Sequence, residues 1–285
     1  MVIRDAMKNI RLLGRMSLYL LRISLRYPVN FVADFIELSF WILVFYFPVI
    51  LFLPQQAMEG SASPVLYTLW GFFIFMLISD TIWSIAGGLR YDQMTGILEQ
   101  NFLAPINEFI YPLARLFRIF IRDIPILIAF PIIFWAITGF FLIKNLALAM
   151  YILAVSLMGF IGFGYLYAGL VLTMKRSAMS ANVIQFLIMI FSAVFYPFKA
   201  LPEPMLTISK LLPFSYYIDL FRTTIIGTQP ELITEPMNIL GITLSPFIAE
   251  LILIHIFTAI FLAIGAITYE KMLIKAKREG TLHTY

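Results

Sequence analysis

Long runs of apolar residues, separated by short polar stretches, repeat along most of the chain. A helix needs about 20 mostly apolar residues to cross a hydrocarbon layer roughly 30 Å thick, because each residue adds about 1.5 Å. The runs are continuous rather than alternating, which favours helices over a transmembrane barrel. We therefore predict six transmembrane helices, over residues 32–53, 65–88, 122–143, 146–173, 181–197 and 246–269.

The composition supports this pattern. Of the 285 residues, 61% are hydrophobic and 13% are charged, and the mean hydropathy is +0.93. A soluble domain carries about 25% charged residues, so this chain has too little charge to cover a soluble surface. The composition excludes a soluble enzyme, a disordered chain and a nucleic-acid-binding protein, despite a pI near 9.2. The predicted fold class is an all-α integral membrane protein.

The basic residues are distributed unevenly between the two sides of the predicted bundle. Sixteen of the twenty Lys and Arg residues lie in the N-terminal segment, the second-to-third connection with the edge of the third span, the fourth-to-fifth connection and the C-terminal tail. Basic residues concentrate on the cytoplasmic side of membrane proteins. Six crossings also place both termini on one side. We predict a cell-membrane protein whose two termini are cytoplasmic.

Residues 1–30 predict an amphipathic helix. Their six basic residues fall on one stripe of a helical wheel, opposite a mostly apolar face, and Tyr27-Pro28 biases the chain out of helical geometry. We interpret this segment as a helix in the cytoplasmic interface. The alternative is that its charges serve only as a topology signal.

Residues 198–245 form an unusual connection between the last two predicted spans. The segment is rich in proline but mostly apolar and aromatic, and its helical pieces, which break at Pro213, are too short to cross a membrane. We predict a re-entrant or interfacial helical hairpin on the extracytoplasmic side, since irregular backbone at membrane depth must be covered by protein or line a cavity. A purely structural interfacial hairpin is the alternative.

The sequence contains no catalytic constellation. It has two histidines and no cysteine, and it lacks the GxxxxGK[ST] motif, so we expect the chain itself to bind no ATP. The clearest polar anomaly within a predicted span is Asp80. An Asp at the centre of a transmembrane helix costs about 2.5–3.5 kcal/mol on insertion scales. Asp80 therefore either contacts substrate or gates a pathway, or it pairs with a Thr, Trp or Arg of a neighbouring helix.

A short polar helix, from Asp92 to Phe102, is predicted after the second span, and it ends before Pro105. The order of an acidic residue, Thr95-Gly96, Leu98-Glu99 and a proline resembles the signature of ABC-2 type transporter permeases. In that family this stretch, here residues 91–104, is the coupling helix that docks into the ATP-binding subunit. The resemblance implies a set of ATPase-coupling residues, namely Asp92, Thr95, Gly96, Leu98 and Glu99.

A second stretch resembles the family motif that precedes the last span. The matching positions are Leu201-Pro202, Pro213, Tyr216-Tyr217, Asp219, Arg222 and Gly227. Together with the intramembrane acid, these matches suggest residues of the translocation pathway or its gate, namely Asp80, Pro213, Tyr217, Asp219 and Arg222.

The resemblance extends over residues 1–285, which it implies are a single transmembrane domain. It also implies an ATP-driven exporter of an apolar or amphipathic substrate, such as a drug-like compound, a lipid or a lipid-linked glycan. ATP and Mg²⁺ would be bound by two copies of a separate ATPase subunit. A second permease copy, identical or paralogous, would complete the pathway within membrane lipid. The alternatives are an ion- or proton-coupled secondary transporter that uses Asp80, and a receptor or scaffold without transport.

Overall fold

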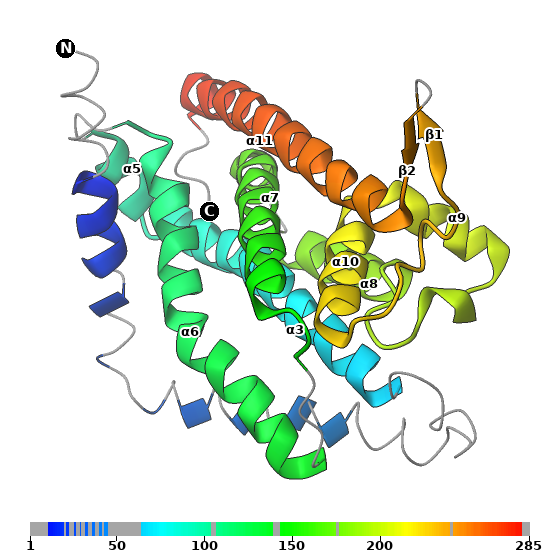
Figure 1. Cartoon of the computed structure of the whole chain (residues 1–285). Coiled ribbons are helices and arrows are strands. Elements are labelled where there is room, and N and C mark those ends of the chain that lie inside the picture. The colour runs from blue at the N-terminus through cyan, green and yellow to red at the C-terminus, as the bar shows by residue number, and fades with distance from the viewer. Residues whose placement is uncertain are drawn as a thin grey trace.

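The computed structural model describes residues 11–19, 21–22, 26, 29, 32–33, 36–37, 40–41, 43–44, 64–103, 107–138, 143–174, 177–239 and 242–280. Parts of the predicted N-terminal helix and of the first and third predicted spans lie outside these residues, as does Pro105. The described chain is mostly helical (Figure 1).

The labelled elements follow one another in this order: α3 (Pro64–Trp83), the π-helix η2 (Ser84–Leu89), α4 (Arg90–Met94), α5 (Ile97–Leu103), α6 (Ile110–Thr138), α7 (Leu146–Thr173), α8 (Ser177–Phe191), the 3₁₀-helix η3 (Phe198–Ala200), α9 (Glu203–Leu211), α10 (Pro213–Ile226), β1 (Met237–Ile239), β2 (Ile242–Leu244) and α11 (Pro246–Glu279). Residues 11–19 are also helical.

Three helices in the described part of the chain are long and apolar enough to cross a membrane. They cover Leu66–Met94, Leu146–Thr173 and Pro246–Glu279. This finding supports an all-α membrane protein. The helix α6 has 29 residues, but charged residues interrupt its apolar sequence, and α8 has only 15 residues. The number of six spans therefore stays a prediction.

The helix bounds differ from the predicted ones where charged residues extend a helix beyond its apolar run. The predicted span 146–173 coincides with α7. In contrast, α11 continues past residue 269 to Glu279, and α6 begins at Ile110 rather than at residue 122. Lys, Glu and Arg are good helix formers, so a helix does not end where its apolar residues end. The fifth predicted span, 181–197, corresponds to α8, which begins and ends earlier.

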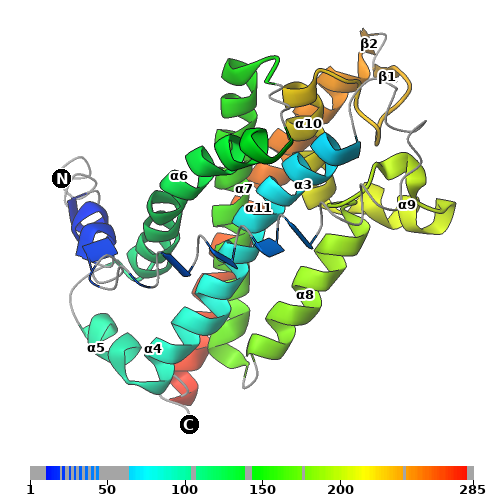
Figure 2. The same ribbon diagram turned by 90° about the horizontal axis from the view of Figure 1, so that it is seen from below.

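The helices α7 and α11 lie side by side (Figures 1 and 2), and glycines allow their backbones to approach. A Cβ atom on Gly162 would lie 2.5 Å from the backbone nitrogen of Leu262, and a Cβ atom on Gly265 would overlap the carbonyl oxygen of Gly162. No larger residue fits at either position without moving the helices apart. Small residues at helix contacts are typical of membrane proteins.

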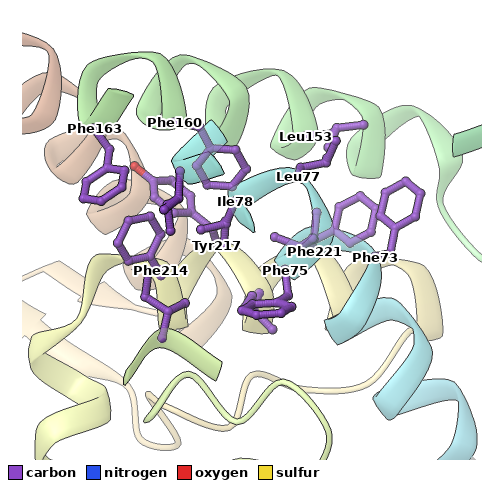
Figure 3. Close-up of a cluster of buried hydrophobic side chains, with 14 of the residues drawn as sticks. Phe73, Phe75, Leu77, Ile78, Leu153, Phe160, Phe163, Phe214, Tyr217 and Phe221 are labelled. Atoms are coloured by element: carbon purple, nitrogen blue, oxygen red, sulfur yellow. The ribbon is translucent and has the colours of Figure 1, made fainter. Parts of the chain in front are cut away.

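The helices α3, α7 and α10 enclose an aromatic core (Figure 3). The Phe73 and Phe221 rings stack with centroids 5.5 Å apart, and Phe163 meets Phe214 edge to face at 5.0 Å. Tyr217 lies within this core, and its hydroxyl hydrogen-bonds to Thr258 Oγ1 of α11 at 2.8 Å. Apolar packing therefore holds α10 firmly inside the bundle.

Residues 192–245, which we call the cap, join α8 to α11. The predicted break at Pro213 is confirmed, because α9 ends at Leu211 and α10 begins at Pro213. The cap also contains an antiparallel strand pair, β1 and β2, which the sequence did not suggest. Figure 2 shows these strands at the opposite end of the molecule from α4 and from the end of α11. Whether α10 is re-entrant stays a prediction.

Candidate functional site

The segment predicted as one coupling helix consists of two helices. The helix α4 ends at Met94, and α5 begins at Ile97. Between them Gly96 has a φ of 73°, a left-handed conformation that glycine adopts without strain. The Thr95 hydroxyl donates to the carbonyl of Tyr91 at 2.9 Å and thus satisfies a carbonyl at the end of α4. The prediction of a continuous helix from Asp92 to Phe102 is therefore wrong.

Asp92 was expected on the exposed docking surface, but it is buried. Its carboxylate forms an ion pair with Arg115 of α6 and accepts a hydrogen bond from the Tyr111 hydroxyl. Each of the paired side chains is only 8% exposed. Arg115 Nη2 also donates to the Tyr111 hydroxyl at 3.2 Å. Asp92 thus holds α4 against the start of α6, because a buried carboxylate needs a cationic partner. Leu98 is buried as well.

Gly88, in the π-helix η2, leaves room for this ion pair. A Cβ atom on Gly88 would overlap the Arg115 guanidinium. Burial, with the neighbouring charge of Arg118, lowers the pKa of Arg115 to about 10, so the group remains protonated at neutral pH. Short π-helical turns within α-helices occur frequently at functional sites.

Thr95 and Glu99 are exposed, and their role in docking an ATPase stays a prediction. Large apolar side chains surround them, namely Tyr91, Met94, Ile97 and Leu103. Exposed apolar residues that adjoin polar ones are a feature of protein interaction sites. The motif alone did not reveal these apolar residues, which occupy exposed positions of α4 and α5. We call Tyr91, Met94, Thr95, Ile97, Glu99 and Leu103 the coupling surface.

The end of α11 lies at the same end of the molecule as α4 and α5, and the N-terminal helical residues lie beside α6 (Figure 2). The Lys277 ammonium of α11 forms an ion pair with Glu108, between α5 and α6, and lies 5.8 Å from the centre of the Phe102 ring. Ser17, in the N-terminal helical residues, donates to the carbonyl of Ala114 at 3.4 Å. The N-terminal helical residues therefore contact α6, whereas the end of α11 contacts α5 and the connection between α5 and α6.

A cavity of about 530 Å³ opens between α3, α6, α8 and the helical residues near position 40. Most of its lining is apolar or aromatic. We call it the groove; its lining residues are Glu37, Trp41, Phe72, Phe75, Met76, Ser79, Asp80, Trp83, Arg122, Asn182, Gln185, Phe186, Met189 and Phe195. Asp80 pairs with Arg122 of α6 across 3.6 Å. Gln185 accepts from Trp83 Nε1 at 2.7 Å and donates to Ser79 Oγ at 2.8 Å.

Asp219 and Arg222 form a second polar centre, inside the cap, where both side chains are fully buried. The Arg222 guanidinium donates to the carbonyls of Ala193 at 2.9 Å and Val194 at 3.1 Å. Asp219 Oδ2 accepts from the backbone nitrogens of Glu231 at 2.7 Å and Leu232 at 2.9 Å. These two side chains fix the turn before α9 and the loop after α10.

A family profile described as "ABC-2 type transporter" matches residues 15–226, which include the coupling surface, the groove and α10. The chain belongs to the ABC-2 type transporter family. The resemblance found in its motifs is thereby confirmed, and the chain is the membrane component, or permease, of an ABC transporter. A comparison with curated proteins found no match.

In this permease the predicted pathway residues occupy two places. Asp80 lines the groove, whereas Tyr217, Asp219 and Arg222 face the core and the cap. Pro213 is the first residue of α10. The lining of the groove, among the described residues, includes only Asp80 of these five. The other four residues all lie on α10, within the cap.

Proposed function

We propose that this permease forms half of the translocation pathway of an ATP-driven exporter. A separate ATPase subunit, in two copies, binds ATP and Mg²⁺ and docks on the coupling surface. A second permease copy completes the pathway. The complex resides in the cell membrane with both permease termini in the cytoplasm.

The observation that carries the proposal is a pair of ion pairs that join the same two helical stretches, Leu66–Met94 and α6. At the coupling end, Asp92 pairs with Arg115, and in the groove, Asp80 pairs with Arg122. One continuous helical stretch, Leu66–Met94, contains both acids, and α6 contains both arginines. The arginines are seven residues apart, or about 10 Å along a helix. A movement of α4 and α5 is therefore passed to both walls of the groove.

The groove supports an apolar or amphipathic substrate, such as a drug-like compound, a lipid or a lipid-linked glycan. Ligand sites are typically apolar cavities with a few polar groups that orient the ligand. Four phenylalanines and two tryptophans supply the apolar surface here. The Asp80–Arg122 pair and the amides of Asn182 and Gln185 supply the polar groups.

The test is Glu99→Arg, which reverses the charge of the coupling surface. In vesicles that contain the permease with its ATPase, we expect this variant to lose substrate-stimulated ATP hydrolysis and export while it folds normally. The control is Glu203→Arg, which changes an exposed acid in the first turn of α9, on the cap. We expect it to retain both activities.

Wild-type ATP turnover in Glu99→Arg would disprove the coupling role. Transport that continues without ATP and stops when an ion gradient is removed would instead indicate a secondary transporter that uses Asp80. If the wild-type complex transports nothing and Glu99→Arg leaves the ATPase activity unchanged, the result would indicate a scaffold.

A further inference from the structure

The cap buries three carboxyl groups close to one arginine. Asp219 of α10 and Glu250 of α11 are fully buried, and Glu231, in the loop between them, is nearly so. The cation is Arg222. An ionised carboxylate is costly to bury unless a cation or hydrogen-bond donors compensate it.

Arg222 does not compensate all three acids. Its hydrogen bonds go to backbone carbonyls of Ala193, Val194 and Tyr196, and none of the ion pairs found among the described residues joins it to a carboxylate. Glu231 Oε2 instead accepts from the backbone nitrogen of Phe198 at 2.6 Å. The charge of Arg222 is thus close to the acids, but Nη1 and Nη2 bond to backbone carbonyls, and Nε is buried without a hydrogen-bond partner among the described residues.

One oxygen of each remaining acid accepts from the same short loop. Asp219 Oδ2 binds the backbone nitrogens of Glu231 and Leu232, and Glu250 Oε1 accepts from the nitrogen of Ile233 at 3.0 Å. Three consecutive backbone groups are therefore held by two acids on two different helices. The position of this loop depends on both acids at once.

The second oxygen of each acid lacks a donor. Asp219 Oδ1 and Glu250 Oε2 are buried with no hydrogen-bond partner among the described residues. The loop brings the two carboxyl groups together, because Asp219 and Glu250 accept from the adjacent backbone nitrogens of Leu232 and Ile233. Two carboxylates have only acceptors, so a hydrogen bond between them requires a proton on one of them. Two adjacent acids in a buried site do not both ionise near neutral pH.

We propose that Asp219 and Glu250 share one proton, and that this proton holds the Glu231–Ile233 loop to α10 and α11. One acid is a neutral carboxylic acid that donates to its ionised partner, and the pair carries one negative charge. The described residues contain no cluster of three or more His, Cys, Asp or Glu that could hold a metal ion. Loss of the proton leaves two facing carboxylates and weakens the hold on the cap.

Other ionisable groups around the pair do not replace this proton. Tyr216 and Arg222 lie on α10, Tyr67 lies on α3, and Glu231 lies on the loop itself. Further along α11, His255 is exposed and hydrogen-bonds to Tyr151 at 2.7 Å. Tyrosine and arginine keep their protons near neutral pH, and Glu231 adds a further negative charge that favours protonation of the pair.

The sign of the pH dependence follows from the bound proton. Free carboxyl groups are ionised near neutral pH, so the folded permease binds one more proton here than the unfolded chain does. The contribution of the pair to stability is therefore complete at acidic pH and is lost as the pH rises through the titration of the pair. This inference concerns the chain itself and holds whatever the substrate or the ATPase.

The test combines infrared spectroscopy with thermal unfolding of the purified full-length permease. At about pH 8, where free carboxyl groups are ionised, we expect the wild type to show the C=O stretching band of a buried carboxylic acid, with a shift in D₂O. Glu250→Gln should abolish the band, because the amide donates to Asp219 without a titratable proton. It should also remove the fall in unfolding temperature at alkaline pH. Glu235→Gln, which changes an exposed acid of the cap, should alter neither.

The absence of the band from the wild type at that pH would overturn the proposal, even if Glu250→Gln failed to fold. An alkaline fall in unfolding temperature that is unchanged in a folded Glu250→Gln would also overturn it. So would stabilisation of the wild type by added Ca²⁺ that Glu250→Gln abolishes, because the site would then hold a cation instead of a proton.

Discussion

Replacement of Asp92 by Asn removes the charge that compensates Arg115 and changes little else. The amide is nearly the same size as the carboxylate, and its oxygen can still accept the hydrogen bond from Tyr111. Arg115, however, remains buried as a cation, because its pKa of about 10 keeps it charged at neutral pH. We therefore expect α4 to lose its hold on α6 and the coupling surface to become mobile.

The size of the effect follows from burial. Both side chains of the pair are 8% exposed, so solvent screens their interaction only weakly. Removal of one partner from a buried ion pair costs about 3–5 kcal/mol. Asp92→Asn belongs at the lower end, since Tyr111 keeps an acceptor. A loss of about 3 kcal/mol lowers an unfolding temperature by roughly 6–12 °C for a domain of 150–250 residues.

Thermal unfolding in detergent, followed by circular dichroism, measures this loss, and a double-mutant cycle isolates the pair. Arg115→Met alone leaves Asp92 as an uncompensated anion and should be equally harmful. The combination of Asp92→Asn with Arg115→Met removes both charges and should be more stable than either single variant. Losses that simply add in the double variant would refute the buried ion pair, because independent sites are additive and coupled ones are not.

Two further predictions concern packing and topology. Gly162→Val should prevent the close approach of α7 and α11 and abolish folding into membranes. Gly87→Ala, whose new methyl group meets no neighbour within 4 Å, should fold. Size-exclusion chromatography compares the folded yields of the two variants, and equal yields would contradict the prediction. The sequence has no cysteine, so a single introduced cysteine can be labelled specifically. A membrane-impermeant thiol reagent applied to intact cells should label Glu235→Cys in the cap and not Glu279→Cys at the end of α11. The opposite labelling pattern would reverse the predicted orientation.

The sequence predicts well those features that local residues determine. The helix α7 has the predicted bounds because a long apolar run follows Asn145, whose side chain accepts from the backbone nitrogen of Leu148 at 3.1 Å and caps the helix. The break at Pro213 is likewise local, because a proline disfavours helical geometry in the residue before it, and Leu212 has an extended backbone. Exposure of Thr95 and Glu99 follows from their polarity.

Features that depend on distant partners were not predictable in the same way. Asp92 looks like an exposed acid until Arg115, 23 positions later in the chain, is seen to cover it. The groove is assembled from several helices, and no single stretch of sequence contains enough of its lining to reveal it. The buried carboxyl pair joins α10 to α11 across the cap, so Asp219 appears in a motif whereas its partner Glu250 does not.

The π-helix η2 has a consequence for the direction in which the coupling segment faces. A π turn contains about one residue more than an α turn, and each residue of a helix turns the chain by about 100°. Side chains after Leu89 are therefore rotated about the helix axis relative to an uninterrupted α3. This angular offset sets the phase at which Asp92 meets α6 while Thr95 and Glu99 face outward. Deletion of one residue from η2 would keep every motif intact and point the coupling surface in another direction.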